Sequence, residues 1–423
     1  MPYGRWVLHL QLEPKKSLDY VAGWFMKAAD FGMHTKSVAA FVSTNSICQG
    51  DQVPILWPLI FGQGFEIVFA HTSFKWANLA SHNAGVTVAI IAISNSAQMQ
   101  KRVFTTGSDG QTVVLAASNI NAYLVPAPSV IVAKESRTPS TRALMVWGNK
   151  PTDGGFLVLD PDERKSLLKE SPDARQFIRP YYGAAEYIRG LERYCLWIPD
   201  DKLEAANSIP SIPPRLEKVR QFRASSKAAE TRPASAFPHR FRQIQAVASR
   251  YSLIVPQVSS ERREFLPVGL LPESSIVSNL AFALYDAPLW NMALIASRLH
   301  LVWIATVCGK LETRYRYSNT LGWNTFPVPT LTEKNKADLT ACAENILLAR
   351  EAHFPATIAD LYDPEKMPEN LRAAHDRNDE VLERIYIGRR FKNDTERLEK
   401  LFEMYTKMTT SLSPRGKRVG HEA

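Results

Sequence analysis

The stretch VAAFVSTNSICQG (residues 38–50), continued by FEIVFAHTSFKWAN (65–78) and VTVAIIAIS (86–94), decides the fold. It contains three short apolar runs, Val38 to Val42, Glu66 to Ala70 and Val86 to Ile93, each bounded by polar or glycine-containing turns. Such runs are typical of strands buried in a largely covered sheet. Residues 51–61, between the first two runs, are apolar at roughly helical spacing. The sequence therefore predicts strand, helix, strand and an α/β fold class.

Polar side chains follow the first two predicted strands. They occur in Ser43-Thr44-Asn45-Ser46 and in the segment from His71 to Asn78. Ligands of open α/β sheets bind beyond the carboxyl ends of strands. We therefore expect a functional site at this end of the sheet.

Composition narrows the class of protein. Of 423 residues, 22% are charged and 45% are apolar, as in ordinary globular proteins. No apolar run approaches the roughly 20 residues of a membrane helix, and no signal peptide opens the chain. The four cysteines form no CxxC pair, so neither a zinc site nor a disulfide framework is indicated. We expect a cytoplasmic protein with no membrane association.

The residue composition and the predicted secondary structure change twice along the chain, near residues 118 and 330. A helix is expected at 17–31, and Asp109-Gly110 marks a hairpin turn between strands at 102–106 and 111–116. Frequent prolines then place a domain boundary near 118, followed by short β-like runs at 123–125, 130–133, 144–147 and 156–159. Helices are expected at 163–169, 172–177 and 215–229, and strands at 195–198 and 251–255. From about 330, long charged amphipathic helices are expected at 334–350, 368–387 and 394–409.

Basic residues concentrate in three segments. Lys plus Arg number 51 against 42 Asp plus Glu, and residues 215–250 are especially basic. Arg220 and Arg223, three residues apart, are expected on one helical face. Such a run is either a solvated surface or a site for an anionic partner, nucleic acid before membrane. Two further segments that interleave arginine with aromatic residues, VSSERREF (258–265) and ETRYRYS (312–318), favour the anionic partner.

An ordered series of motifs resembles one known family. It consists of FVSTNSICQGDQVPILWPLIF, FAHTSFKWAN, VPAPSVIV, NKPTDGGFLVLDPDE, FIRPYYGAAEYIRG, CLWIPD, VSSERREFLPVGLL, VCGKLETRYRYS, NTFPVP and LYDPEKMPENLRAAHDRND. The series is similar to the C-terminal portion of type IIL restriction–modification enzymes of the MmeI kind. These are adenine-N6 DNA methyltransferases fused to a target-recognition domain. The resemblance covers residues 17–409, nearly the whole chain.

The resemblance implies a domain organisation. Residues 17–117 would be the later part of a Rossmann-like methyltransferase domain that uses S-adenosylmethionine. Residues 118–330 would form a mixed α/β target-recognition domain for double-stranded DNA, and residues 331–410 a helical C-terminal domain. Residues 1–16 lie outside the resemblance, and residues 411–423 are expected to be a disordered basic tail.

The resemblance also implies where an adenine flipped out of the duplex would stack. The family's aromatic residue follows the strand that carries FAH, and Phe74 or Trp76 matches it, with Phe74 favoured. An extruded base loses its stacking, and an aromatic face restores part of it. The alternative is that both rings simply pack under a loop.

Two segments match those that lie against DNA bases. Glu312, Arg314 and Arg316 share one face if their segment is extended, and their side chains can pair with cytosine and guanine. The alternative is an exposed strand with a cross-pair between Glu312 and an arginine. Ser278-Asn279-Leu280 matches the second base-contacting segment.

A third segment is expected to contact phosphates, which position a protein without reading sequence. Its residues are Ser259, Ser260, Arg262 and Arg263. Alternatively, one of the two arginines pairs with Glu261 or Glu264.

Two motifs that adenine-N6 methylation requires are absent from the sequence. There is no glycine-rich loop after a strand, and no Asn/Asp-Pro-Pro-aromatic loop; the adjacent prolines Pro213-Pro214 lack both the donor and the aromatic residue. Gly62-Gln63-Gly64 precedes a strand and is interpreted as a turn. We therefore expect S-adenosylmethionine to bind only with a missing N-terminal half, supplied by an upstream polypeptide. The sheet left in this chain would have one exposed edge.

Three functional hypotheses follow. The first is the C-terminal part of a site-specific adenine-N6 DNA methyltransferase of a restriction–modification system, inactive alone. The second is a non-catalytic DNA-specificity subunit or an inactive truncated remnant. The third is an unrelated α/β protein whose basic surface binds RNA or is only solvated.

Overall fold

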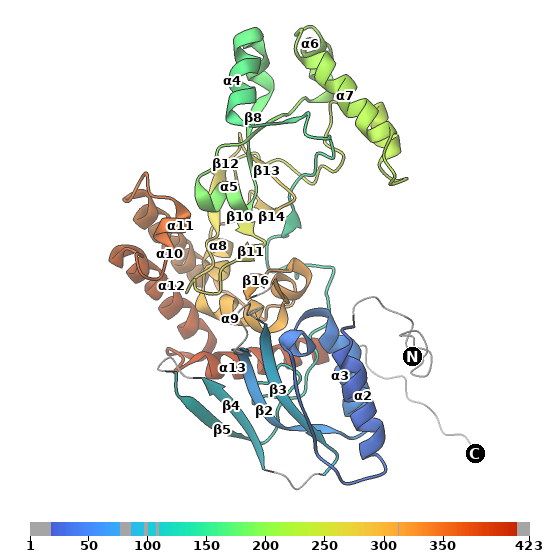
Figure 1. Cartoon of the computed structure of the whole chain (residues 1–423). Helices are drawn as coiled ribbons and strands as arrows, with labels where there is room; N and C mark the ends of the chain where they lie inside the picture. Colours follow the sequence, from blue (N-terminus) through green and yellow to red (C-terminus); the bar gives the residue numbers. More distant parts are fainter. Residues whose placement is uncertain (1–17, 77–85, 97–99, 107–109, 312, 413–423) are drawn as a thin grey trace, which may run out of the picture. The chain divides into compact units, whose positions relative to one another are not determined.

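The computed structural model describes residues 18–76, 86–96, 100–106, 110–311 and 313–412 (Figure 1). These residues fall into two compact units. Unit 1 comprises residues 1–137, 299–331 and 383–423, and unit 2 comprises residues 138–298 and 332–382. Among the described residues, no helix combines the length and apolar character needed to cross a membrane.

The N-terminal part of unit 1 is a five-stranded sheet with the strand order β1-β3-β2-β4-β5. Its strands are β1 (Ala39–Thr44), β2 (Glu66–Lys75), β3 (Thr87–Ser94), β4 (Lys101–Thr106) and β5 (Thr112–Ala117). β3 is antiparallel to both β1 and β2, so β1 and β2 run in the same direction. β4 is parallel to β2, and β5 is antiparallel to β4. All five strands that the sequence predicts here are confirmed, whereas Asp109 of the expected turn lies outside the described residues.

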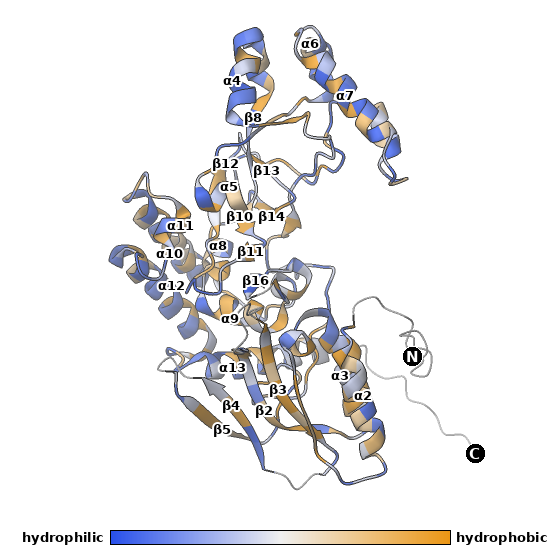
Figure 2. Cartoon of the chain, viewed as in Figure 1, coloured by the Kyte–Doolittle hydropathy of each residue, from blue (hydrophilic) through white to orange (hydrophobic). Residues whose placement is uncertain are grey.

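Helices α2 (Val21–Gly32) and α3 (Val53–Gly62) lie against this sheet, as Figure 1 shows. Between β1 and α3 run the short helices η1 (Asn45–Cys48) and η2 (Gly50–Gln52). The buried Phe25 ring contacts Phe41 at 4.8 Å and Trp57 at 5.8 Å between centroids. Helix α3 is largely apolar, as its colouring in Figure 2 shows. The Trp57 indole on this helix donates to the Ile47 carbonyl at 2.8 Å, so its polar atom is satisfied. The predicted helices are confirmed.

Both outer strands of the sheet have a partner on one side only among the described residues: β1 pairs with β3, and β5 pairs with β4. Val42 on β1 is 52% exposed, and on α2 Trp24 is 47% and Phe31 65% exposed. An unpaired strand with exposed apolar neighbours can receive a further chain segment.

The remaining elements of unit 1 are helical or short. They are α9 (Arg298–Val307, whose first residue belongs to unit 2), β15 (Lys310–Leu311), β16 (Arg314–Arg316), η6 (Asn319–Trp323) and α13 (Asp394–Leu412). The strands expected at 123–125 and 130–133 are not formed. The Asn121 side chain instead accepts from the backbone of Tyr123 and Val125, and Leu124 adopts a φ of 61°. The Tyr123 ring then stacks on Phe402 of α13, with centroids 5.3 Å apart.

Unit 2 contains two four-stranded sheets. Their orders are β12-β10-β14-β6 and β13-β8-β9-β7. The strands are β6 (Val146–Trp147), β7 (Val158–Leu159), β8 (Ile178–Tyr182), β9 (Tyr194–Leu196), β10 (Tyr251–Pro256), β12 (Gly269–Pro272), β13 (Ile276–Val277) and β14 (Ala281–Tyr285), and β11 (Val258–Ser259) follows β10. Most of these strands are only two to five residues long.

The five helices that the sequence analysis expected in unit 2 are present with shifted ends, and six further helical segments among the described residues were not predicted. Together they are α4 (Pro161–Glu170), η3 (Pro172–Phe177), α5 (Ala184–Arg189), η4 (Asp200–Lys202), α6 (Leu203–Asn207), α7 (Ile212–Ala224), η5 (Arg232–Ala236), α8 (Trp290–Ile295), α10 (Glu333–Glu351), α11 (Ile358–Leu361) and α12 (Glu369–Ile387, from residue 383 in unit 1). Residues 172–177 form a 3-10 helix, and the helix expected over 215–229 ends at Ala224. The long C-terminal helices are confirmed.

Arg223 of α7 is fully buried, which contradicts its expected place on an exposed face with Arg220. Its guanidinium donates to five backbone carbonyls, those of Pro151, Thr152, Ala234, Phe237 and Arg240. Three of these carbonyls, those of Pro151, Ala234 and Phe237, also accept a backbone N–H. The long side chain therefore supplies a further donor to each of them and holds residues 151–152 against residues 234–240.

We expect Arg223→Ala to lower the free energy of unfolding of unit 2 by about 3 kcal/mol or more, because five backbone carbonyls each lose one donor. Urea unfolding followed by tryptophan fluorescence measures the change. Arg220→Ala is the matched control, since Arg220 is exposed and pairs only with Glu217 on its own helix. Equal stability of the two variants would contradict the structural role of Arg223.

Candidate nucleic-acid interface

The carboxyl ends of β1 and β2 lie at the same end of the sheet. Val88 of β3 pairs with Thr44 of β1 on one side and with Phe74 of β2 on the other. Adjacent strands are about 4.8 Å apart, so Thr44 and Phe74 stand roughly 10 Å apart across β3. The structure thus brings together the two polar segments that follow the predicted strands, as the sequence analysis expected.

The β2 side of this site is aromatic. The Phe74 ring meets His71 edge-on, with centroids 4.8 Å apart and planes at 66°, and Trp76 lies 6.4 Å from Phe74. The pairing with β3 is irregular between His71 and Phe74, so the strand bulges where these rings gather. Phe74 is half-buried, whereas Trp76 is 43% exposed. Phe74 is therefore the better-supported ring of the two. Asn78, the last residue of the predicted polar segment, lies outside the described residues.

The β1 side of the site is polar. The Asp19 carboxylate accepts hydrogen bonds from the hydroxyls of Thr44 and Ser46, each at 3.1 Å. Its backbone N–H donates to the Gln52 side chain at 3.1 Å. These hydrogen bonds fix the path of the chain as it leaves β1.

The predicted base-reading segment around Arg314 forms an exposed hairpin in unit 1. β15 and β16 pair antiparallel, Lys310 with Tyr315 and Leu311 with Arg314. Arg314 and Arg316 are both exposed and Tyr315 is half-buried, so the alternation expected of an extended strand is confirmed for these residues. Glu312 lies outside the described residues. The buried Tyr317 hydroxyl and His300 of α9 are hydrogen-bonded at 2.8 Å, and this contact anchors the hairpin.

The second predicted base-reading segment, Ser278-Asn279-Leu280, lies in unit 2. Ser278 is buried and its hydroxyl accepts from the Leu280 N–H at 3.2 Å, whereas Leu280 is 54% exposed. Asn279 is half-buried, and its main chain bonds to Asn149 and Gln257. The segment is thus held by its main chain, with Asn279 and Leu280 turned toward the surface.

The predicted phosphate-contacting segment is also in unit 2. Ser259 is buried and accepts from Arg263 at 3.4 Å, and Ser260 accepts from the Arg262 N–H. Arg262 forms a surface ion pair with Glu365 at 2.7 Å, in which both side chains are mostly exposed. Such a pair contributes little to stability, so a phosphate can replace its carboxylate at low cost.

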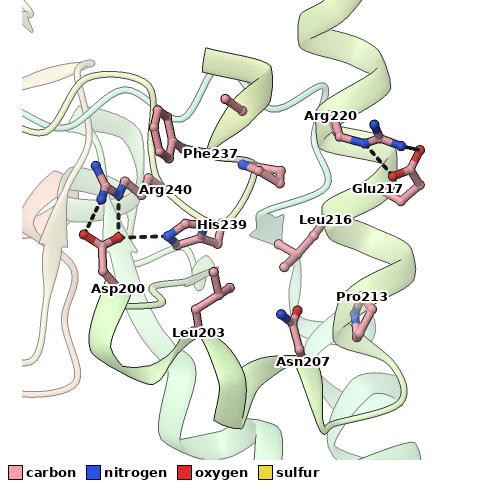
Figure 3. Close-up of a pocket in the computed structure, with 12 residues that line it drawn as sticks. Asp200, Leu203, Asn207, Pro213, Leu216, Glu217, Arg220, Phe237, His239 and Arg240 are labelled. Atoms are coloured by element: carbon pink, nitrogen blue, oxygen red, sulfur yellow. Dashed lines mark hydrogen bonds and ion pairs between the residues drawn. The ribbon is translucent and has the colours of Figure 1, made fainter. Parts of the chain in front are cut away.

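Much of the basic run at 215–250 is engaged within unit 2. A pocket of about 530 Å³ lies in this region. In it Arg240 and His239 both bond to Asp200, and Arg220 bonds to Glu217 (Figure 3). The Arg240 guanidinium and the His239 ring lower the pKa of the Asp200 carboxyl. Because its cations already have carboxylate partners, this pocket is a poor receptor for a phosphate. Arg223, described above, also points inward.

Asn149 and Gly148 support the second segment, and the sequence analysis missed both. A Cβ on Gly148 would overlap the carbonyl of Ser278 and lie 2.6 Å from that of Val277. Asn149, fully buried, donates its N–H to Val277 and accepts from the N–H of Asn279. Only a residue without a side chain allows the two chain segments to approach this closely.

Gly148→Ala is expected to displace the 277–280 segment and to lower the free energy of unfolding by about 1–3 kcal/mol, as overpacking does. Thermal unfolding monitored by circular dichroism measures the loss. Gly62→Ala serves as the control, because a Cβ there meets nothing within 4 Å. A Gly148→Ala variant as stable as Gly62→Ala would contradict the close approach.

Three family models match the chain in order. They are the MmeI DNA-methyltransferase domain at residues 5–105, the MmeI target recognition domain at 126–330, and the MmeI C-terminal domain at 331–413. The first match includes part of the 1–16 segment that the sequence analysis left outside the resemblance. The mixed α/β fold with a C-terminal helical segment agrees with these matches.

Two known proteins resemble nearly all of the chain. DNA methyltransferase A of Bacillus subtilis (strain 168) is 37% identical over 395 residues, which are 93% of this chain and 44% of that protein. The structure of the type IIL restriction–modification enzyme MmeI in complex with DNA is 34% identical, with a TM-score of 0.84 over 97% of this chain and 55% of that one. The chain thus spans about half the length of the proteins it matches. It belongs to the MmeI family and carries that family's methyltransferase, target-recognition and C-terminal domains.

Proposed function

We propose that this chain is the DNA-binding and base-holding part of a site-specific adenine-N6 DNA methyltransferase of a restriction–modification system. The observation that carries the proposal is the match of a methyltransferase domain and a target recognition domain within one chain. A relative named DNA methyltransferase A and the DNA complex of MmeI support the same conclusion. Its partner is double-stranded DNA, and the place of action is the cytoplasm.

In this proposal, Phe74 stacks on the flipped adenine and Trp76 closes the aromatic surface beside it. Three observations support Phe74: its place at the carboxyl end of β2, the edge-on His71 ring, and its half-buried state. A ring held by neighbours loses little freedom when a base stacks on it. The polar cluster at Asp19, Thr44 and Ser46 lies at the same level of the sheet, where the base's polar edge would approach.

DNA contacts divide into those that read bases and those that position the protein. The exposed alternation of Arg314 and Arg316 supports base reading by the hairpin, together with Glu312 of the same segment. The surface position of Asn279 and Leu280 supports a second reading segment that begins at Ser278. Phosphate contacts come from Ser259, Ser260, Arg262 and Arg263.

In this proposal, the seat for S-adenosylmethionine lies outside the described residues. Such a seat needs a glycine-rich loop that follows a strand and opens a helix. Here Gly62-Gln63-Gly64 follows helix α3 and precedes strand β2, and Gly64 turns the chain with a φ of 82°. This order of elements is the reverse of the one required, which supports the proposal.

We infer that a partner polypeptide, encoded upstream, supplies the cofactor-binding half. The unpaired edge of β1 and the exposed Val42, Trp24 and Phe31 support this inference, because they offer main-chain and apolar contacts to a further strand. The second candidate function, a non-catalytic specificity subunit or inactive remnant, is supported by the same reversed order of elements around Gly62-Gln63-Gly64.

The purified chain alone is expected to transfer no methyl group from S-adenosylmethionine to duplex DNA. Incorporation of tritiated methyl groups into genomic DNA measures this, with and without the co-expressed upstream polypeptide. Activity restored by the partner supports the enzyme part. Inactivity of the pair despite specific DNA binding favours the specificity subunit, and activity of the chain alone would refute the placement of the cofactor half.

Arg314→Ala is expected to relax base preference at one position, at a cost of about 1–3 kcal/mol in binding. Arg262→Ala should instead weaken binding to all sequences equally and lower the salt slope by about one. Fluorescence anisotropy at several salt concentrations distinguishes the two, with the exposed Arg102→Ala of β4 as control. A uniform loss for Arg314→Ala would contradict its base-reading role, and a flat salt response would exclude these segments as a DNA surface.

A further inference from the structure

Asn149 joins two loops of unit 2 that are far apart in the sequence. Its side-chain oxygen accepts from the Gln245 N–H at 2.7 Å, and its side-chain nitrogen donates to the Ala246 carbonyl at 3.0 Å. Its main chain bonds to Val277 at 2.7 Å and to Asn279 at 3.0 Å. One fully buried residue thus holds residues 243–246 beside residues 277–279.

The loop at 243–246 is fixed by its main chain. Lys150 and Gln243 exchange two backbone hydrogen bonds, at 2.9 and 3.1 Å. With the two bonds from the Asn149 side chain, the backbone of this loop is held on both sides of Ile244. Its exposed side chains are therefore presented from a rigid support, which lowers the entropy lost on binding.

The side chains that these loops expose are carboxamides and aliphatic groups. Gln243, Ile244 and Gln245 are exposed, Ile244 by 48%, and Leu280 is 54% exposed beside the half-buried Asn279. Within the part of the chain that the structure describes, the carboxamides of Gln243, Gln245 and Asn279 make no side-chain hydrogen bond. Residues 243–247 (QIQAV) and 278–280 (SNL) contain no acidic side chain. The surface therefore offers free hydrogen-bonding groups without a charge that repels DNA.

We propose that Gln243 and Gln245 are specificity-determining residues that read A·T base pairs in the major groove of DNA. A glutamine carboxamide bonds to adenine N6 and N7 together, and aliphatic carbon atoms such as those of Ile244 contact the thymine methyl group. The proposal rests on the proposed function, since it requires duplex DNA as the ligand. The proposal adds residues 243–245 as a base-reading segment beside the predicted Ser278-Asn279-Leu280. It also states that residues 243–245 prefer A·T base pairs.

The chemistry favours duplex DNA over other polymers. The major groove of an RNA helix is too deep and narrow for side chains to read, so paired RNA does not fit this rigid loop. A protein partner would use Ile244 and Leu280 as apolar contacts but would not require the paired donor and acceptor of two glutamines. Binding of such a partner would leave the DNA preference of glutamine variants unchanged.

The test selects bound molecules from a duplex library of randomised sequence. Wild type, Gln243→Ala, Gln245→Ala and the control Gln176→Ala are compared, because Gln176 is an exposed glutamine of η3 in the same unit. We expect one or two A·T positions in the wild-type consensus to become degenerate in the loop variants. Discrimination there should fall about 5- to 150-fold, the value of a bidentate base contact. The control should keep the wild-type consensus.

A gain-of-function variant separates base reading from a structural role. In Gln243→Arg and Gln245→Arg, the guanidinium pairs with guanine O6 and N7, so preference should move from A·T to G·C at the position that the alanine variant relaxes. Unchanged circular dichroism spectra show that each variant is folded. A loop needed only for folding cannot produce a new base preference.

The possible results of the selection experiment distinguish failure of this proposal from failure of the proposed function. Wild type that selects a sequence, with all glutamine variants keeping it, overturns the inference while the proposed function stands. A uniform loss of affinity for every sequence in the loop variants also overturns it. Wild type that binds no duplex overturns the proposed function itself, and preference for single-stranded RNA does the same.

Discussion

The antiparallel strand β3 is the constraint on which unit 1 depends. It pairs with β1 on one edge and β2 on the other, so these two strands run in one direction and end at one level. Without that arrangement, the aromatic rings after β2 and the polar cluster after β1 would occupy opposite ends of the sheet. The helices that pack on the sheet, α2 and α3, bury Phe25 and Trp57. The order and direction of these strands thus place an aromatic group and a polar group side by side in the candidate site.

Unit 2 is organised differently, because its strands are short and long loops run between them. Buried polar side chains add hydrogen bonds that tie these loops together. Arg223 serves five carbonyls, and Asn149 serves two loops through both its side chain and its main chain. Interior polar groups that are fully hydrogen-bonded specify one arrangement of the chain, since any other leaves them unpaired. Exposed segments can then carry varied side chains on a constant support.

Local patterns predicted what depends on neighbouring residues. The apolar runs at 38–42, 66–70 and 86–93 became β1, β2 and β3, and the alternation in ETRYRYS became an exposed strand. The segment at 123–133 failed, because the Asn121 side chain replaces strand pairing. Local sequence patterns could not predict the structural roles of Arg223 and Asn149. Their partners lie up to 72 and 136 residues away, and no spacing in the sequence marks such contacts.

The open side of β1 also bears on how this protein behaves in a cell. A strand with unsatisfied N–H and C=O groups, flanked by Val42 and the α2 aromatics, is a template for sticking to other copies or to unrelated nascent chains. The amount of correctly folded protein would then depend on how quickly the outer edge of β1 is covered after synthesis. A segment that pairs with β1 would therefore protect the chain from aggregation, quite apart from any part that this segment plays in a reaction.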